Sequence, residues 1–178
     1  MKTFATAMML ALFTTGMAQA QSKPANAIEE NSLKSMLENL GYEPKEIKYT
    51  DNRTGYSIQV KFKGYDAEMR IVLSPSGSNV WGVLNLAELK SEHNAEASRF
   101  VKLLQLNLTH GPCHFRISSD GKYLTLARGM FAKGLTAKEL REHIEELLST
   151  AEKTVEHWDV TKWTAAPAPD TVKALEMK

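Results

Sequence analysis

Three residues whose side chains could bind a metal ion lie close together in the sequence, namely His110, Cys113 and His114. A structural zinc site needs three or four ligands that converge on one point, and they usually come as two pairs at set spacing. No second pair lies near this group, and strand alternation would place Cys113 and His114 on opposite faces. We therefore expect no metal site and no cofactor, and interpret Cys113 as a buried structural thiol.

Hydrolysis by a serine nucleophile would require a histidine that acts as its base. The hydroxyl-rich segment 74–78 lacks the Gly-x-Ser-x-Gly pattern and has the composition of a hairpin turn. His93, His143 and His157 lie in polar or helix-surface contexts, and a fold could still bring any of them to a serine. We predict no catalytic residues. A small hydrolase with scattered Ser and His residues, or a carrier of a small apolar ligand, stays open as the alternative.

The first twenty residues have the pattern of an export signal. Lys2 precedes an apolar core over residues 7–13, and Ala18 and Ala20 form a small-x-small cleavage pattern. The core is far shorter than the roughly 20 residues that a membrane-spanning helix needs. We predict a signal peptide over residues 1–20, a flexible leader over 21–27, and a periplasmic or secreted protein with no stable membrane insertion after signal removal.

The charge balance argues against a nucleic-acid partner. The chain has 22 Lys and Arg and 21 Asp and Glu residues, and one of the bases is Lys2 of the signal. The mature chain is thus formally neutral, and its bases alternate with acids instead of forming the basic stripe that phosphates require. Cys113 is the only cysteine, so an intramolecular disulfide is excluded and the apolar core must stabilise the fold.

Hydrophobic periodicity predicts an α+β domain over residues 28–160 and a flexible tail over 161–178. Apolar residues alternate with polar ones in several segments joined by short turns, which is typical of an antiparallel sheet. Thr136 and Glu139 form a capping box at the start of the last helix. The expected elements are a helix near 28–40, strands near 46–49, 56–62, 69–73 and 80–86, a helix near 94–108, strands near 113–118 and 124–126, and a helix over 136–158. This order, α-ββββ-α-ββ-α, predicts a two-layer sandwich with helices on one face of the sheet.

The second helix is apolar on two sides. We expect the stripe formed by residues 97, 100, 101, 104 and 108 to face the sheet, which leaves Leu103 and Leu106 outside it. A second subunit, a client segment or the returning tail could cover them, and a homodimer seam is the leading prediction. The alternative is that both leucines pack under another helix. The segment with Trp81, Val83 and Leu84 is the next candidate for an interface.

The order of elements resembles that of the YbjN family, whose domain shares the fold of the type III secretion chaperones. The stretches that carry the resemblance are 107–108, 111–118, 120–126 and 134–136. The resemblance implies a non-enzymatic, often dimeric domain that binds or regulates other proteins. The export signal departs from the secretion chaperones, which work in the cytoplasm. We therefore predict an exported protein-binding, regulatory or chaperone-like module that uses an apolar groove or an exposed sheet edge.

Overall fold

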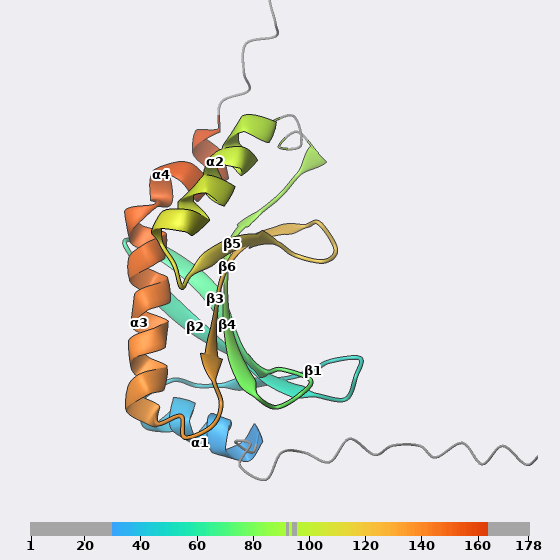
Figure 1. Ribbon diagram of the computed structural model, residues 1–178, viewed down its shortest axis with the longest axis vertical. Coiled ribbons are helices and arrows are strands. Elements are labelled where there is room, and N and C mark those ends of the chain that lie inside the picture. Colours follow the sequence, from blue (N-terminus) through green and yellow to red (C-terminus); the bar gives the residue numbers. More distant parts are fainter. Residues whose placement is uncertain (1–29, 92, 94–95, 164–178) are drawn as a thin grey trace, which may run out of the picture.

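The computed structural model describes residues 30–91, 93 and 96–163 of the chain (Figure 1). The predicted signal peptide, the leader and the segment 164–178 lie outside the described residues. In chain order the elements are α1 (Glu30–Asn39), β1 (Lys45–Lys48), β2 (Thr54–Phe62), β3 (Tyr65–Leu73), β4 (Asn79–Glu88), α2 (Ala97–Thr109), β5 (His114–Ile117), β6 (Tyr123–Phe131), α3 (Ala137–Lys153), α4 (Val155–Trp158) and η2 (Val160–Lys162).

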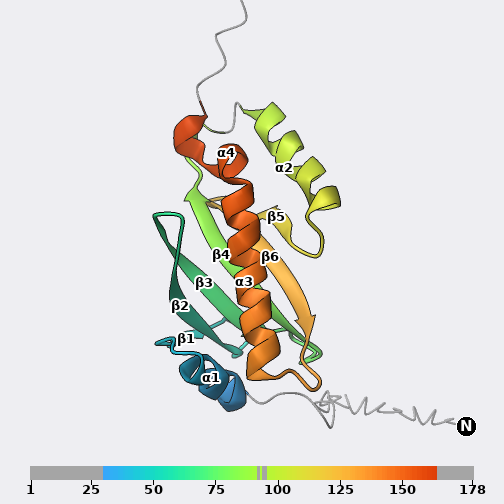
Figure 2. The ribbon, with the colours of Figure 1, turned by 90° about the vertical axis from the view of Figure 1, so that its left-hand side faces the viewer.

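The strands form one antiparallel sheet with the order β1-β2-β3-β4-β6-β5. Short turns join β1 to β4 as a meander, and α2 leads from β4 to the edge strand β5. All the helices lie on the same side of the sheet, and α3 crosses its middle (Figures 1 and 2). The predicted two-layer α+β sandwich and its order of elements are confirmed.

Strand β2 shows how alternation builds the interior. Its apolar side chains point toward the helices and are buried, whereas Ser57, Gln59 and Lys61 lie on the outer face. Lys63 and Gly64 both have positive φ, of 45° and 84°. Two such residues form the hairpin turn whose twist matches the flanking strands, so this turn sets the register of β2 with β3.

Helix α3 lies across the sheet at a close approach. A Cβ atom added to Gly82 of β4 would lie 2.8 Å from Cδ1 of Leu147, so the absence of a side chain at position 82 lets the helix approach the strand. The predicted capping box is present, with the hydroxyl of Thr136 accepting from the amide of Glu139. In return the backbone N–H of Thr136 donates to the carboxylate of Glu139 over 2.9 Å, and this bond lowers the pKa of Glu139 below its usual value.

The predicted single helix over 136–158 is instead two helices. The hydroxyl of Thr154 donates to the carbonyl of Thr150 over 2.6 Å at the end of α3, and the chain then turns into α4. The indole of Trp158 folds back and donates to the carbonyl of Ala151 over 2.7 Å. Hydroxyls that bond back in this way bend helices, and the bend brings Trp158 into the core.

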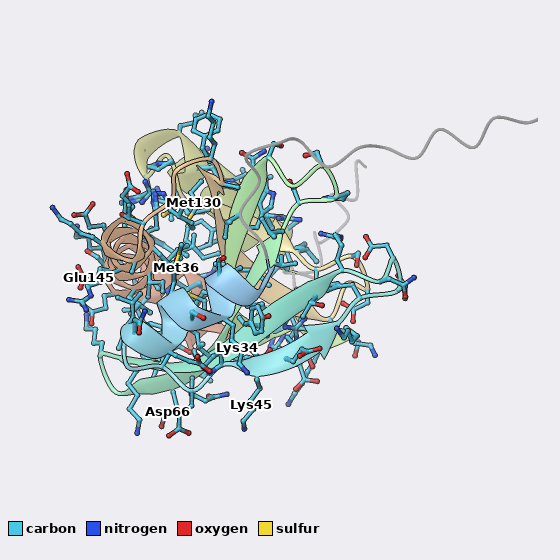
Figure 3. All side chains as sticks on the ribbon, turned by 90° about the horizontal axis from the view of Figure 1, so that it is seen from below. Lys34, Met36, Lys45, Asp66, Met130 and Glu145 are labelled. Atoms are coloured by element: carbon cyan, nitrogen blue, oxygen red, sulfur yellow. The ribbon has the colours of Figure 1, made fainter. Side chains whose placement is uncertain are left out.

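Helix α1 closes the other end of the core. Viewed from below, Met36 of α1 and Met130 of β6 lie between the helices and the sheet (Figure 3). Asp66 and Glu145 lie at the periphery in the same view. The methionines can fill this irregular space because their side chains are unbranched and flexible.

One acid of α3 has a partner on the sheet. Glu146 forms an ion pair with Arg128, which β6 carries on the face toward the helices. A second ion pair lies within the helix, between Lys138 and Glu142 at 3.8 Å. Glu146 thus neutralises a base that the sheet places between the two layers.

The folded part of the chain extends beyond residue 160, where we expected the tail to begin. Trp163 is buried, and the carboxylate of Asp159 accepts bonds from the amide and hydroxyl of Thr161. The hydroxyl of Tyr65 donates to the same carboxylate over 2.7 Å. These bonds attach η2 to β3. Among the described residues, no helix is both long and apolar enough to span a bilayer.

Acid is expected to release this attachment. Burial opposes ionisation of Asp159, but the bonds from Thr161, Tyr65 and Lys162 outweigh it and lower the pKa of the carboxyl. Its stabilising effect is present above the unfolded-state pKa of about 3.9 and is lost as pH falls through the lower folded-state pKa. We expect Asp159→Asn to lower the free energy of unfolding by about 1 kcal/mol at pH 7.

Urea denaturation of both proteins between pH 7 and pH 3 tests this. The difference between wild type and Asp159→Asn should shrink as the pH falls below about 3.9, because protonation of the carboxyl in the unfolded chain then removes part of its stabilising effect. A difference that stayed constant, or grew, as the pH was lowered would show that the ionised carboxylate does not stabilise the fold.

Candidate functional site

Helix α2 is attached to the edge strand β5 by one side chain. The amide oxygen of Asn107 accepts from the backbone N–H of Phe115 over 2.6 Å, and its amide nitrogen donates to the carbonyl of the same residue over 3.3 Å. Strand β5 is the last in the sheet, so these backbone groups would otherwise lie at an open edge. Asn107 therefore takes the place of a neighbouring strand at this position.

This attachment determines which side of α2 faces inward, and our prediction of that side was wrong. Leu103 is only 2 % exposed, and Leu106 packs partly buried against the core. At 100° per residue, the side of α2 that faces inward lies about 120° around the helix axis from the side that we predicted. Leu103 and Leu106 face the protein's own interior, so they cannot form the predicted dimer seam.

The predicted inner stripe contains the residues that face outward. Val101, Leu104 and Leu108 of α2 are 53 %, 62 % and 88 % exposed, and Ile117 of β5 is 49 % exposed. We name these four residues the α2–β5 ridge. Large aliphatic side chains are usually buried, and an exposed group of them marks a contact surface.

A shallow groove connects the helix part of the ridge to its strand part. It has a volume of about 80 Å³ and lies between α2 and β5, with Phe100 and Leu103 on the helix side and Phe115 and Ile117 on the strand side. The backbone N–H of Ser118 donates to the carbonyl of Tyr123 on β6. Successive residues of a strand direct their backbone groups to opposite sides, so the N–H and C=O of the preceding residue, Ile117, point away from β6. The groove thus ends at a free piece of sheet edge.

The charged side chains around the ridge are basic. Helix α2 contains Arg99 and Lys102 and no acid, and Arg116 lies next to Ile117 on β5. Among the described residues, none of these three forms an ion pair, although the guanidinium of Arg116 lies over the ring of Trp81 at 5.9 Å. Helix α3, by contrast, has three bases and five acids. The ridge therefore favours a partner whose apolar contact residues have acidic neighbours.

The other predicted interface does not form a single surface. Trp81 and Val83 lie on the outer face of the sheet and are half-buried, whereas Leu84 points inward and is wholly buried. Alternation separates them, since residues 81 and 84 of one strand face opposite sides. The rings of Trp81 and His114 meet edge to face with centroids 5.9 Å apart, which covers part of the tryptophan.

Cys113 is buried, as expected for a structural thiol. Burial raises the pKa of its side chain, which works against thiolate formation. The described part of the chain holds no group of three or more His, Cys, Asp or Glu residues that could bind a metal ion.

The serine hydroxyls of the segment 74–78 form hydrogen bonds within the turn between β3 and β4. Ser76 lies 3.1 Å from Ser74 and 2.6 Å from Ser78, oxygen to oxygen, and Ser74 accepts from the amide of Asn79. Two of the histidines we considered as bases have other partners in the described structure, and Nδ1 of the third, His143, is buried without a hydrogen-bond partner there. His93 accepts from the backbone of Lys90, and His157 lies 3.2 Å from Glu156. This arrangement does not favour the hydrolase alternative.

A larger cavity, of about 550 Å³, lies between the ends of β3 and β4 and the α4–η2 segment. Its described lining includes charged side chains, among them Glu88, Lys90 and Asp159. The carboxylate of Asp159 is already bonded within the protein. The walls combine apolar side chains, among them Trp158 and Trp163, with these charged groups, so the cavity does not test whether the chain carries a small apolar ligand.

The comparison with family models decides against the resemblance to YbjN. Residues 2–76 match the peptidase propeptide and YPEB domain (PepSY) family. In the described structure this stretch contains α1, β1, β2 and β3. The order of elements suggested YbjN because that order is not specific to one family.

The fold is also found in a solved structure. The crystal structure of an uncharacterized protein from Methanothermobacter thermautotrophicus superposes with a TM-score of 0.53 and 16 % identity, over 76 % of this chain and 98 % of that one. At this identity the likeness concerns the fold alone. No curated protein matches the chain.

The PepSY match is compatible with a protein-binding module that is not itself an enzyme. The family description names a peptidase propeptide, which is a part that accompanies a peptidase. The matched stretch ends before α2 and β5, so the ridge lies in the part of the chain that the PepSY match does not cover.

Proposed function

We propose that this chain is an exported regulatory protein that binds a peptidase through the α2–β5 ridge and has no catalytic activity of its own. The observation that carries the proposal is the exposure of Val101, Leu104, Leu108 and Ile117 on one surface beside a groove. The PepSY match supports a peptidase as the partner. The apolar core at residues 7–13 with its cleavage pattern supports export.

The chemistry of the ridge indicates which part of the partner it binds. Aliphatic side chains in a shallow groove contact a short apolar segment, and the unpaired bases Arg99 and Lys102 attract acids beside that segment. Two copies of this chain would bring the bases of both α2 helices together if they paired through the ridge. We therefore favour a different protein as the partner, and a homodimer stays a prediction that light scattering can test.

Leu104→Glu is expected to weaken binding of the peptidase at least tenfold, which corresponds to about 1.4 kcal/mol. The glutamate would place a charge in the centre of the ridge, where the partner excludes water. Because Leu104 is 62 % exposed, folding should be almost unchanged. Gln105→Glu is the matched control, since it adds the same charge at the next position of the helix, which is also exposed.

The mature chain and both variants would serve as bait in an envelope extract of the source cells. The captured peptidase would then be purified, and its hydrolysis of a fluorogenic peptide measured with increasing amounts of each protein. We expect inhibition by wild type and Gln105→Glu, and little by Leu104→Glu. Capture of no peptidase, or equal inhibition by Leu104→Glu, would contradict the proposal.

A further inference from the structure

The described chain ends beside the groove. The ring of Trp163 meets the ring of Phe100 edge to face, with centroids 5.2 Å apart, and its indole donates to the carbonyl of His157 over 3.1 Å. Phe100 also lines the groove that runs to Leu104 and Ile117. The segment that follows Trp163 therefore starts at one end of the groove.

This following segment, residues 164–178, has the composition that the ridge favours. It contains Val172, Leu175 and Met177, with the acids Asp170 and Glu176 and the bases Lys173 and Lys178 among them. Eight residues lie between Trp163 and Val172, and the nine steps from one to the other can span up to about 30 Å. The helix part of the ridge, from Val101 to Leu108, is only about 10 Å long. Residues 172–177 can thus reach every part of the ridge.

We propose that residues 172–177 occupy the α2–β5 ridge in the free protein and compete there with the external partner. This inference rests on the proposed function of the ridge and adds its regulation. Val172 and Leu175 contact Leu104 and Ile117, and the neighbouring acids lie near the basic rim. A short tether gives the segment an effective concentration in the millimolar range, so even a contact with a Kd of about 1 mM is substantially formed.

Charge favours the tail over a second copy of the chain as the occupant. The ridge is bordered by Arg99, Lys102 and Arg116, and α2 has no acid. A second α2 would bring the same bases and no acid, whereas the tail brings Asp170 and Glu176 together with Lys173 and Lys178 and so adds no net positive charge. The tail also needs no second molecule, so its docking does not depend on protein concentration.

Methyl NMR spectra of the mature chain and of a variant that ends at Trp163 test the docking. We expect the deletion to shift the methyl signals of Leu104, Leu108 and Ile117 and to leave that of the buried Ile144 unchanged. A synthetic peptide of residues 164–178 should reverse these shifts at millimolar concentration. In the full chain, Val172→Asp/Leu175→Asp should reproduce the deletion, and Ala166→Asp/Ala168→Asp, with the same added charge, should not.

Two results would overturn the inference. In the first, the deletion leaves the ridge methyl signals unchanged. In the second, these signals depend on protein concentration and light scattering reports a doubled mass, which would make a second copy the occupant.

Peptidase inhibition separates this inference from the proposed function. If the tail competes, its deletion should strengthen inhibition about three- to tenfold. If deletion has no effect while Leu104→Glu still abolishes inhibition, only the tail inference fails. If Leu104→Glu inhibits as well as wild type, the proposed function itself fails.

Discussion

Leu147→Ala is expected to lower the free energy of unfolding by about 3 to 4 kcal/mol. Leu147 is wholly buried, and its Cδ1 atom lies where helix α3 approaches Gly82 of β4 most closely. Truncation removes the apolar contact and leaves a cavity that the stiff sheet and helix can close only in part. Urea denaturation measures the loss. Leu108→Ala, the same change at an 88 % exposed position of α2, should cost less than about 0.5 kcal/mol.

The two residues at this contact should also depend on each other. Gly82→Ala is expected to destabilise the wild type, because its Cβ would lie 2.8 Å from Leu147. In the Leu147→Ala background the same methyl group enters the vacated space and should cost much less. A double-mutant cycle measures the difference. If the two effects simply add, the close approach of α3 to β4 at Gly82 is not a feature of the folded protein.

Asn107→Ala is expected to lower the free energy of unfolding by about 2 kcal/mol, because it leaves the N–H and C=O of Phe115 without their partner. Hydrogen exchange at the Phe115 amide should become at least tenfold faster, which a general loss of stability would not confine to β5. Since Asn107 attaches α2 to β5, the variant should also weaken binding of any partner that contacts both parts of the ridge.

Thr109→Ala is the control for this prediction. Its hydroxyl donates to the carbonyl of Leu106 within the same helix and makes no bond to β5. We expect exchange at Phe115 to stay slow in that variant. Equal exchange rates at Phe115 in Asn107→Ala and in wild type would show that the side chain does not protect the sheet edge.

The local pattern of apolar and polar residues was enough to predict the fold. Alternation in β2 predicted which side chains are buried, and the Thr136 and Glu139 pair predicted the start of α3. Both signals arise within a few neighbouring residues, so they do not depend on the rest of the chain. The opposite faces of Trp81 and Leu84 could also have been deduced from alternation, and the sequence interpretation should not have joined them in one interface.

The outward face of α2 could not be found in this way. Helix α2 has apolar residues on two sides, so hydrophobic periodicity alone fits two orientations. The inner side is determined by Asn107, whose amide bonds the backbone of Phe115 eight residues away, and by Phe100, which packs against Trp163. A polar residue on the less obvious stripe was the available signal, and it has meaning only once β5 is known to be an edge strand.

The sequence by itself determined the order of the elements, the antiparallel sheet and the buried faces of its strands, because these depend on local periodicity and on short turns. Only the tertiary structure decided which apolar residues remain in contact with water. That choice depends on contacts between distant segments, which turn Leu103 toward the core and leave Val101, Leu104, Leu108 and Ile117 as a surface for binding.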